Sequence, residues 1–199
     1  SDYYKAIRAY RENKLDSAGY YIGSAINRYR SSIKTDSLVF AYVQQALVVW
    51  TRTGLEEALH VMETAVSAAE KLPRKSVARV AAYSRTGQLL TQRYDFKGAA
   101  DYFRKAEAAV ESSGPPNRHY VLLYNYIAVM YLTLEDFAPA KRYAKRAYDM
   151  NVALEGKEGA DMPIILQTLY YISRYSEDYE QALADAKEFQ RVIQLHYPP

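Results

Sequence analysis

Few side chains in this sequence have the types and spacings that catalysis or metal binding requires. The three histidines, His60, His119 and His196, lie far apart, and none belongs to an HExxH pair that could hold zinc from one helix face. We interpret them as solvated or core histidines, with His60 near the apolar face of its helix. There is no cysteine, so disulfides and thiolate metal sites are excluded.

Motifs for phosphate binding and acyl transfer are also missing. The eight glycines are scattered, none is followed by Lys-Ser or Lys-Thr, and no G-x-S-x-G occurs. Carboxylate pairs such as Glu56/Glu57 and Glu135/Asp136 fall at expected turns and helix starts, where capping and the helix dipole account for them. We therefore predict that the chain is not an enzyme and needs no cofactor or metal.

Composition is that of a folded chain. The 199 residues are 49% hydrophobic and 25% charged, and the net charge is only +3. Residues 1–35 hold seven basic and three acidic side chains, whereas residues 116–199 hold nine basic and eleven acidic ones. No segment has the concentrated basic field of a nucleic-acid binder, and no stretch reaches the roughly 18 apolar residues of a membrane span. We expect neither a nucleic-acid partner nor a membrane span within this segment.

Four columns of residue types recur along the chain and give the main structural signal. The first column is always alanine, in steps of 40, 41, 41 and 42 residues: Ala18, Ala58, Ala99, Ala140 and Ala182. Seven residues later come Ala25, Ala65, Ala106, Ala147 and Phe189. Twelve residues before the first column stand Ala6, Ala46, Gly87, Ala128 and Tyr170. Three residues before it stand the large apolar residues Leu15, Leu55, Phe96, Phe137 and Tyr179.

This spacing predicts a repeated pair of helices. Residues seven apart share a helix face, and a small side chain there lets a neighbouring helix approach closely. Turns within the units are expected at Asn13-Lys14, Thr53-Gly54, Tyr94-Asp95, Glu135-Asp136 and Glu177-Asp178. Asp95, Asp136 and Asp178 are predicted N-caps of the second helices. The breaks between units are expected at Ser31 to Ser37, Pro73, Gly114 to Asn117, and Gly156 to Pro163.

These residues resemble the tetratricopeptide repeat (TPR). The segment through Tyr83, Gly87, Leu90, Phe96, Ala99, Phe103 and Ala106 carries the motif, with Tyr in the family's usual Trp position. It recurs in Tyr124, Ile127, Ala128, Tyr131, Phe137, Ala140 and Ala147 and more loosely in the other units. The period is similar to the long, roughly 42-residue variants of kinesin light chains and bacterial peptide-sensing regulators.

The resemblance implies an all-α fold, a right-handed superhelical α-α solenoid of about five helix pairs. We expect one repeat domain over residues 1–199, with units at about 1–35, 36–76, 77–117, 118–159 and 160–199. The chain begins with Ser1 rather than Met, which favours a segment excised from a longer protein. The absence of cysteine fits a periplasmic or extracytoplasmic setting and leaves the cytoplasm open.

The resemblance also implies that the first helix of each pair lines a ligand groove. By that mapping the groove residues are Tyr3, Tyr10, Trp50, Arg85, Gln88, Gln92, Asn125, Tyr126, Gln167, Tyr171 and Arg174. Aromatic, amide and guanidinium groups can grip a peptide backbone and offer ring surface to its side chains. The alternative is that these aromatic residues form core between repeats.

Two functions remain open. The first is a non-catalytic module that binds a protein or peptide, as the sensory or adaptor part of a larger bacterial signalling or regulatory protein. The second is a self-associating structural scaffold, or a periplasmic or lipoprotein assembly factor, whose surface serves a homo-oligomer. The apolar residues Phe189, Val192, Ile193 and Leu195 of the last expected helix favour the first, because more chain, a transmembrane segment or a partner should cover that face.

Overall fold

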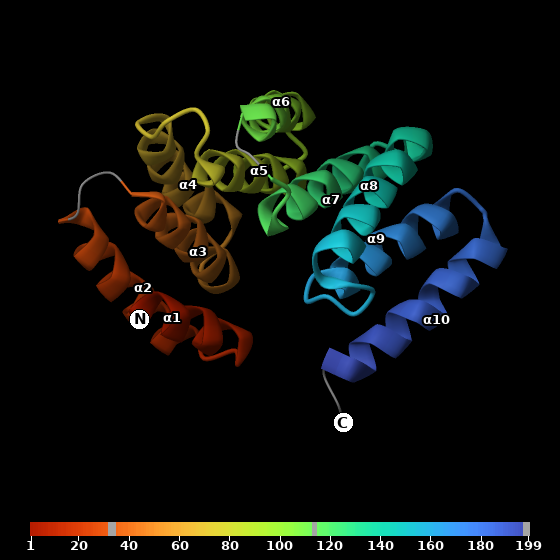
Figure 1. The fold of residues 1–199 in the computed structure, drawn as a ribbon, viewed down its shortest axis with the longest axis horizontal. Helices are drawn as coiled ribbons and strands as arrows, with labels where there is room; N and C mark the ends of the chain where they lie inside the picture. The colour runs from red at the N-terminus through yellow and green to blue at the C-terminus, as the bar shows by residue number, and fades with distance from the viewer. Residues whose placement is uncertain (32–34, 113–114, 197–199) are drawn as a thin grey trace. The chain divides into compact units, whose positions relative to one another are not determined.

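The computed structural model describes residues 1–31, 35–112 and 115–196, and these residues form ten helices and no strand (Figure 1). The chain divides into two compact units, Ser1–Gly114 and Pro115–Pro199. The predicted break at Gly114, the residues 32–34 of the first break and residues 197–199 lie outside the described residues. The expectation of a single repeat domain stays a prediction.

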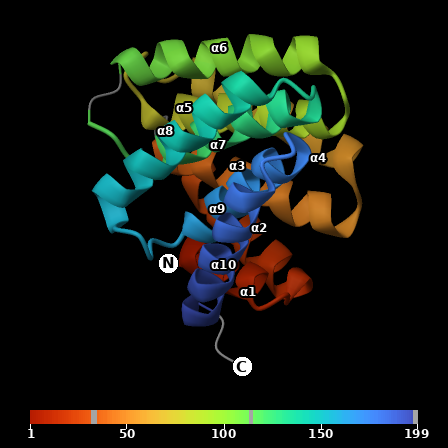
Figure 2. The same cartoon turned by 90° about the vertical axis from the view of Figure 1, so that its right-hand side faces the viewer.

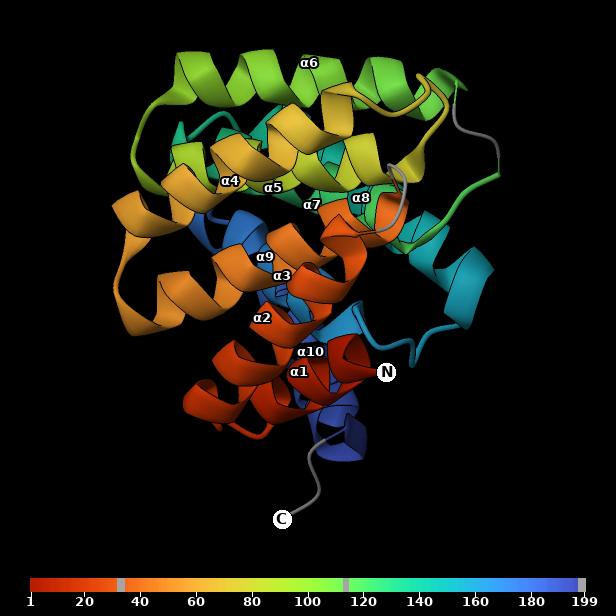
Figure 3. The same cartoon turned by 90° about the vertical axis from the view of Figure 1, so that its left-hand side faces the viewer.

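Unit 1 contains three helix pairs. Its helices are α1 (Asp2–Arg11), α2 (Leu15–Arg30), α3 (Asp36–Arg52), α4 (Leu55–Glu70), α5 (Val77–Gln92) and α6 (Phe96–Ser112). Each first helix packs on its own partner and on the pair before it, so that α3 contacts α4, α2 and α1, and α5 contacts α6, α4 and α3. Figure 3 shows this succession, with α1 and α2 at one end of the unit and α6 at the other.

Unit 2 contains two helix pairs built in the same way. Its helices are α7 (Arg118–Thr133), α8 (Phe137–Glu155), α9 (Met162–Tyr175) and α10 (Tyr179–His196). The first helix of the second pair, α9, contacts α7, α8 and α10 (Figure 2). The predicted helix pairs are therefore confirmed.

The small-residue columns lie where the helices cross. Ala18, Ala58, Ala99 and Ala140 are completely buried, and Ala182 is 6% exposed. At the α5–α6 crossing a Cβ on Gly87 would lie 2.6 Å from the ring of Phe103, so only glycine fits there without a shift. The alternation of small and large residues thus sets how closely the two helices of a pair approach.

In four of the five helix pairs the turn ends the first helix with a left-handed residue that is not glycine: Asn13, Tyr94, Glu135 and Glu177 have φ of 56° to 63°. The amide of the next residue donates to a carbonyl five positions back, as from Asp136 to Tyr131 at 2.9 Å. This is the hydrogen bond of a Schellman motif, which satisfies a carbonyl at the helix end.

Only two of the three predicted aspartate caps form. The carboxylate of Asp95 accepts from the amide of Gly98 at 2.9 Å, and that of Asp178 accepts from Gln181 at 3.2 Å. Asp136 precedes α8 without a side-chain cap hydrogen bond. The prediction for Asp136 was wrong, because the residue three positions on, which donates the amide to Asp95 and Asp178 in their turns, is here Pro139, which has no N–H.

We expect Glu135→Gly to raise the free energy of unfolding by about 0.5–1 kcal/mol. A left-handed conformation costs a residue with a Cβ roughly 1–2 kcal/mol, and the added entropy of an unfolded glycine offsets part of that gain. Urea unfolding monitored by circular dichroism measures the change in midpoint. Glu135→Ala keeps the Cβ and serves as the control, which should show no gain; equal midpoints for the two variants would contradict the argument.

The starts of successive first helices are tied by side chains about 40 residues apart. Ser76, the N-cap of α5, donates from Oγ to Oδ1 of Asp36 at 2.7 Å. In unit 2, Arg118 at the start of α7 donates from Nε and Nη2 to the two oxygens of Asp161, each at 2.5 Å. Hydrogen bonding to Asp161 raises the pKa of the Arg118 guanidinium above its ordinary value.

Candidate functional site

The α3 helix presents a row of half-buried apolar residues at helical spacing. Val43, Leu47 and Trp50 stand at positions i, i+4 and i+7 and are each partly exposed. Their neighbours Tyr42, Ala46 and Val48 are buried in the unit. The row therefore leaves an indole ring, the only one in the chain, partly exposed beside aliphatic side chains.

Tyr10 packs near the end of the same helix. Its ring lies on the buried cluster of Ala9, Ala18 and Val48, and its hydroxyl is 3.0 Å from Oγ1 of Thr51 on α3. Tyr10 thus joins α1 to α3 as part of the packing of unit 1. Tyr3, at the other end of α1, is half-buried.

The predicted residues on α5 share one face of that helix. Arg85 and Gln88 are half-buried, and Nη1 of Arg85 donates to Oε1 of Gln88. Gln92, one turn further, is exposed. This hydrogen bond between side chains one turn apart holds a guanidinium and an amide together on α5.

The predicted residues on α9 are the most accessible of those in unit 2. Gln167 and Arg174 are exposed, and Tyr171 between them is 39% exposed. The Tyr171 ring stacks on Tyr175 with centroids 6.1 Å apart and planes at 16°. Stacked rings lose little side-chain entropy on binding, which suits them to contact a partner.

Two predicted groove residues on α7 lie inside the protein. Asn125 is 0% exposed and Tyr126 is 4% exposed. Within the described residues the amide nitrogen and oxygen of the Asn125 side chain have no hydrogen-bond partner. A ligand could reach Asn125 or Tyr126 only after neighbouring side chains move, so their role in a groove stays a prediction.

The histidines and carboxylates form no group that could hold a metal ion among the described residues. His60 is exposed rather than near the apolar face of α4, and its Nδ1 lies 3.1 Å from Oε2 of Glu63. That part of the prediction was wrong, because the position faces away from the packed side of the helix. The side chain of His196 lies outside the described part of the chain.

A basic hollow of about 330 Å³ lies in unit 1 and is lined in part by Arg74, Arg79 and Lys105. The Arg79 guanidinium donates to the carbonyls of Ala69, Glu70 and Leu72, between 2.7 and 3.1 Å, at the end of α4. Burial raises the pKa of the Tyr83 hydroxyl in the same wall. Arg79 therefore caps free carbonyl groups at the C-terminus of α4, which is a structural role.

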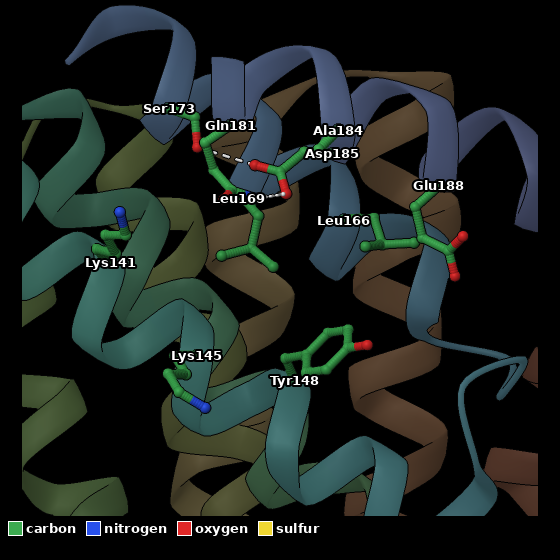
Figure 4. A pocket seen from close by; sticks show the side chains of 10 residues that line it. All are labelled: Lys141, Lys145, Tyr148, Leu166, Leu169, Ser173, Gln181, Ala184, Asp185 and Glu188. Atoms are coloured by element: carbon green, nitrogen blue, oxygen red, sulfur yellow. Dashed lines mark hydrogen bonds between the residues drawn. The ribbon is translucent and has the colours of Figure 1, made fainter. Parts of the chain in front are cut away.

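A second cavity, of about 470 Å³, lies among the helices of unit 2, and we call it the α8–α10 cavity (Figure 4). It is lined by Lys141, Lys145 and Tyr148 of α8, Leu166, Leu169 and Ser173 of α9, and Gln181, Ala184, Asp185 and Glu188 of α10. The Asp185 carboxylate accepts from Oγ of Ser173 at 2.8 Å and from Nε2 of Gln181 at 2.9 Å. Asp185 is only 8% exposed.

Sequence reasoning missed this cavity, although the repeat carried a signal for it. Three residues after the first alanine column stand Tyr21, Val61, Tyr102, Tyr143 and Asp185. In the fourth pair the ring of Tyr143 stacks on Tyr124 and Tyr131, with centroids 6.2 and 5.9 Å away. In the fifth pair the shorter Asp185 stands in place of the ring. The space that a tyrosine ring fills in the fourth pair is therefore left as a cavity with a carboxylate in its wall.

None of the helices in the described residues combines the length and the apolar character that crossing a membrane requires.

Comparison with known proteins places the fold. No protein-family model and no curated protein matches the sequence. Among solved structures, BtubC from P. vanneervenii is similar with a TM-score of 0.69 and 21% identity, over 98% of this chain and 79% of that one. A kinesin light chain-type protein of Podosopora anserina with nearly identical TPR-like repeats gives 0.66 and 10%, over 100% and 95%.

A third structure, MamA residues 41 to the end from Desulfovibrio magneticus RS-1, gives a TM-score of 0.53 and 14% identity, over 96% of this chain and 90% of that one. At such identities the likeness concerns the fold, and it extends over essentially the whole chain. Together with the helix pairs and their buried alanine columns, it shows that this chain has the all-α fold of the TPR-like repeat proteins.

Proposed function

We propose that this chain is a non-catalytic module that binds a polypeptide through the exposed faces of its first helices. The observation that carries the proposal is the row Val43, Leu47 and Trp50 on α3, which leaves an indole and two aliphatic side chains half-exposed. TPR-like folds are generally protein-interaction modules, which supports the same conclusion. The accessible α9 residues Tyr171 and Arg174 offer a second set of contacts.

The chemistry of these faces suits peptide recognition. Trp, Tyr and Arg dominate the energetics of protein interfaces, because they combine large contact area with a polar group. Amides such as Gln92 and Gln167 are exposed and can pair with a peptide backbone. We also propose a sensory or adaptor role in a larger bacterial signalling or regulatory protein, and this part of the proposal rests on the sequence alone.

Trp50 provides the test, because it is the only tryptophan in the chain. Peptides selected by display on the purified chain should shift the emission of Trp50 to the blue when they cover its half-exposed ring. In anisotropy measurements with a labelled peptide, Trp50→Ala should weaken binding by about thirtyfold, the loss typical of a hot-spot residue.

The matched control is Tyr20→Ala, which removes an aromatic ring that is 74% exposed on α2, a second helix. It should change the peptide affinity by less than about twofold. A peptide that binds tightly, leaves the Trp50 emission unchanged and tolerates Trp50→Ala would place the binding surface elsewhere and end the proposal for α3.

A self-associating scaffold is the second candidate, and exposed apolar residues on α10 favour it. Tyr179, Leu183 and Leu195 are 66%, 58% and 55% exposed. Light scattering over a range of concentrations separates the two candidates. A mass that doubles with concentration and returns to that of the monomer in Leu183→Glu would support the scaffold, whereas a constant monomer mass would exclude it.

A further inference from the structure

We propose that the α8–α10 cavity binds a primary ammonium group on an apolar stem, as at the end of a lysine side chain of a partner polypeptide. The residues that line this site lie on the second helices α8 and α10 and on α9, and none of them belongs to the α3 row. The α8–α10 cavity would thus select a ligand by its charge and its apolar stem, a preference that the fold alone does not imply.

The buried carboxylate of Asp185 is the first argument. Moving an ionised carboxylate out of water is costly unless a cation or several hydrogen bonds compensate it. Asp185 is 8% exposed and receives hydrogen bonds from two neutral groups, the hydroxyl of Ser173 and the amide of Gln181. No ion pair among the described residues includes Asp185. The two neutral donors offset the cost of burying the ionised carboxylate only in part, so a cation bound in the cavity would stabilise it further.

The cavity walls are the second argument. Tyr148, Leu166 and Leu169 line the same space as Asp185, with Leu166 and Leu169 on α9 (Figure 4). Lysine side chains bury their methylene stems along apolar surface while the ammonium finds a polar partner. An apolar wall that leads to the buried carboxylate of Asp185 fits such a group.

The hydrogen bonds already made by Asp185 favour an ammonium over a guanidinium. Ser173 occupies one lone pair on Oδ2, and Gln181 occupies one on Oδ1. A guanidinium binds a carboxylate best through both oxygens in a fixed fork, whereas an ammonium is a compact charge that can donate a hydrogen bond to any remaining lone pair.

The two lysines of the opposite wall are already paired with other carboxylates. Nζ of Lys141 lies 3.8 Å from Asp178, and Nζ of Lys145 lies 2.6 Å from Asp149. Glu188, on the same side as Asp185, pairs with Arg191 at 2.9 Å. Lys141 and Lys145 repel an incoming cation weakly, because both ammonium groups are exposed and their charges are offset.

The test uses n-hexylammonium as the probe and n-hexanol as its uncharged match, in ¹⁵N NMR titrations of the full chain. Saturable shifts for hexylammonium are expected in α9 and α10 around the cavity. Asp185→Asn should weaken hexylammonium about tenfold or more without changing the response to hexanol, since only the charge is removed. Lys141→Gln should tighten it by about two- to fivefold, since one repelling charge goes.

Glu180→Gln is the matched control, because it removes one negative charge from an exposed position of α10 outside the cavity. It should alter the affinity by less than about twofold. Should Asp185→Asn lose its fold, Ala184→Leu fills the cavity from an exposed lining position and keeps the carboxylate, and it should abolish the shifts.

Equal binding to the wild type and Asp185→Asn, or no saturable shift in the wild type, would overturn the proposal. Hexanol binding as tightly as hexylammonium would overturn it too, because the cavity would then be merely apolar. The result is independent of peptide binding at α3, because hexylammonium should leave the Trp50 emission unchanged.

Discussion

Ala140→Leu is expected to lower the free energy of unfolding by about 1–3 kcal/mol or more, because it overpacks a crossing that has no free space. Ala140 is completely buried at the α7–α8 crossing, in a cluster with Ala128, Ala144 and Ile172. Three added carbons would have to push α8 away from α7 or force neighbouring side chains out of their rotamers. Ala99→Leu should act in the same way at the α5–α6 crossing, since Ala99 is also fully buried.

The control for Ala140→Leu is Ala138→Leu, which adds the same three carbons to an exposed position in the first turn of α8. Its unfolding midpoint in urea should stay within about 0.5 kcal/mol of the wild type, as is usual for surface substitutions. If Ala140→Leu unfolded like Ala138→Leu, the alanine columns would not be contact positions, and the register of the repeat would have to be redrawn.

Arg118→Met is expected to cost about 2–3 kcal/mol of stability, because it leaves the carboxylate of Asp161 buried without its cation. Asp161 is 4% exposed, and both its oxygens accept hydrogen bonds from the Arg118 guanidinium. The loss should stay below that of fully buried pairs, since the Arg118 side chain is itself 49% exposed. The interaction ties the first turn of α7 to the start of α9.

A double-mutant cycle isolates this pair. Arg118→Met combined with Asp161→Asn should be more stable than Arg118→Met alone, because the second change removes the orphaned charge. Arg142→Met, at an exposed position on α8, is the matched control and should have little effect. Strictly additive losses in the cycle would mean that the Arg118–Asp161 pair contributes nothing to holding α7 and α9.

The repeat made much of the fold predictable. Side-chain size recurs at fixed steps, and only a stack of similar helix pairs gives the same size the same surroundings five times. The alanine columns, the turn at each left-handed residue and the aspartate caps at Asp95 and Asp178 followed from this recurrence. Each of them depends on residues close together in the chain.

The candidate site was less predictable. The groove residues were placed by helical position, which gives the direction of a side chain but not what covers it. Gln167, Tyr171 and Arg174 are indeed accessible on α9, whereas Asn125, at a comparable predicted position on α7, is sealed from solvent. Burial depends on every neighbouring element, so one helix pattern cannot decide it.

By itself, the sequence determined that the chain forms helix pairs, where each pair turns, and which small residues meet at the crossings, because these properties are local or repeat with the period. Only the tertiary structure decided that Arg118 meets Asp161 and that Asp185 lies in a cavity with Ser173 and Gln181. Arg118 lies on α7 whereas Asp161 precedes α9, and Ser173 lies on α9 whereas Asp185 and Gln181 share α10. Whether such side chains meet depends on distances between helices, and the recurrence of residue types at fixed steps along the chain does not specify those distances.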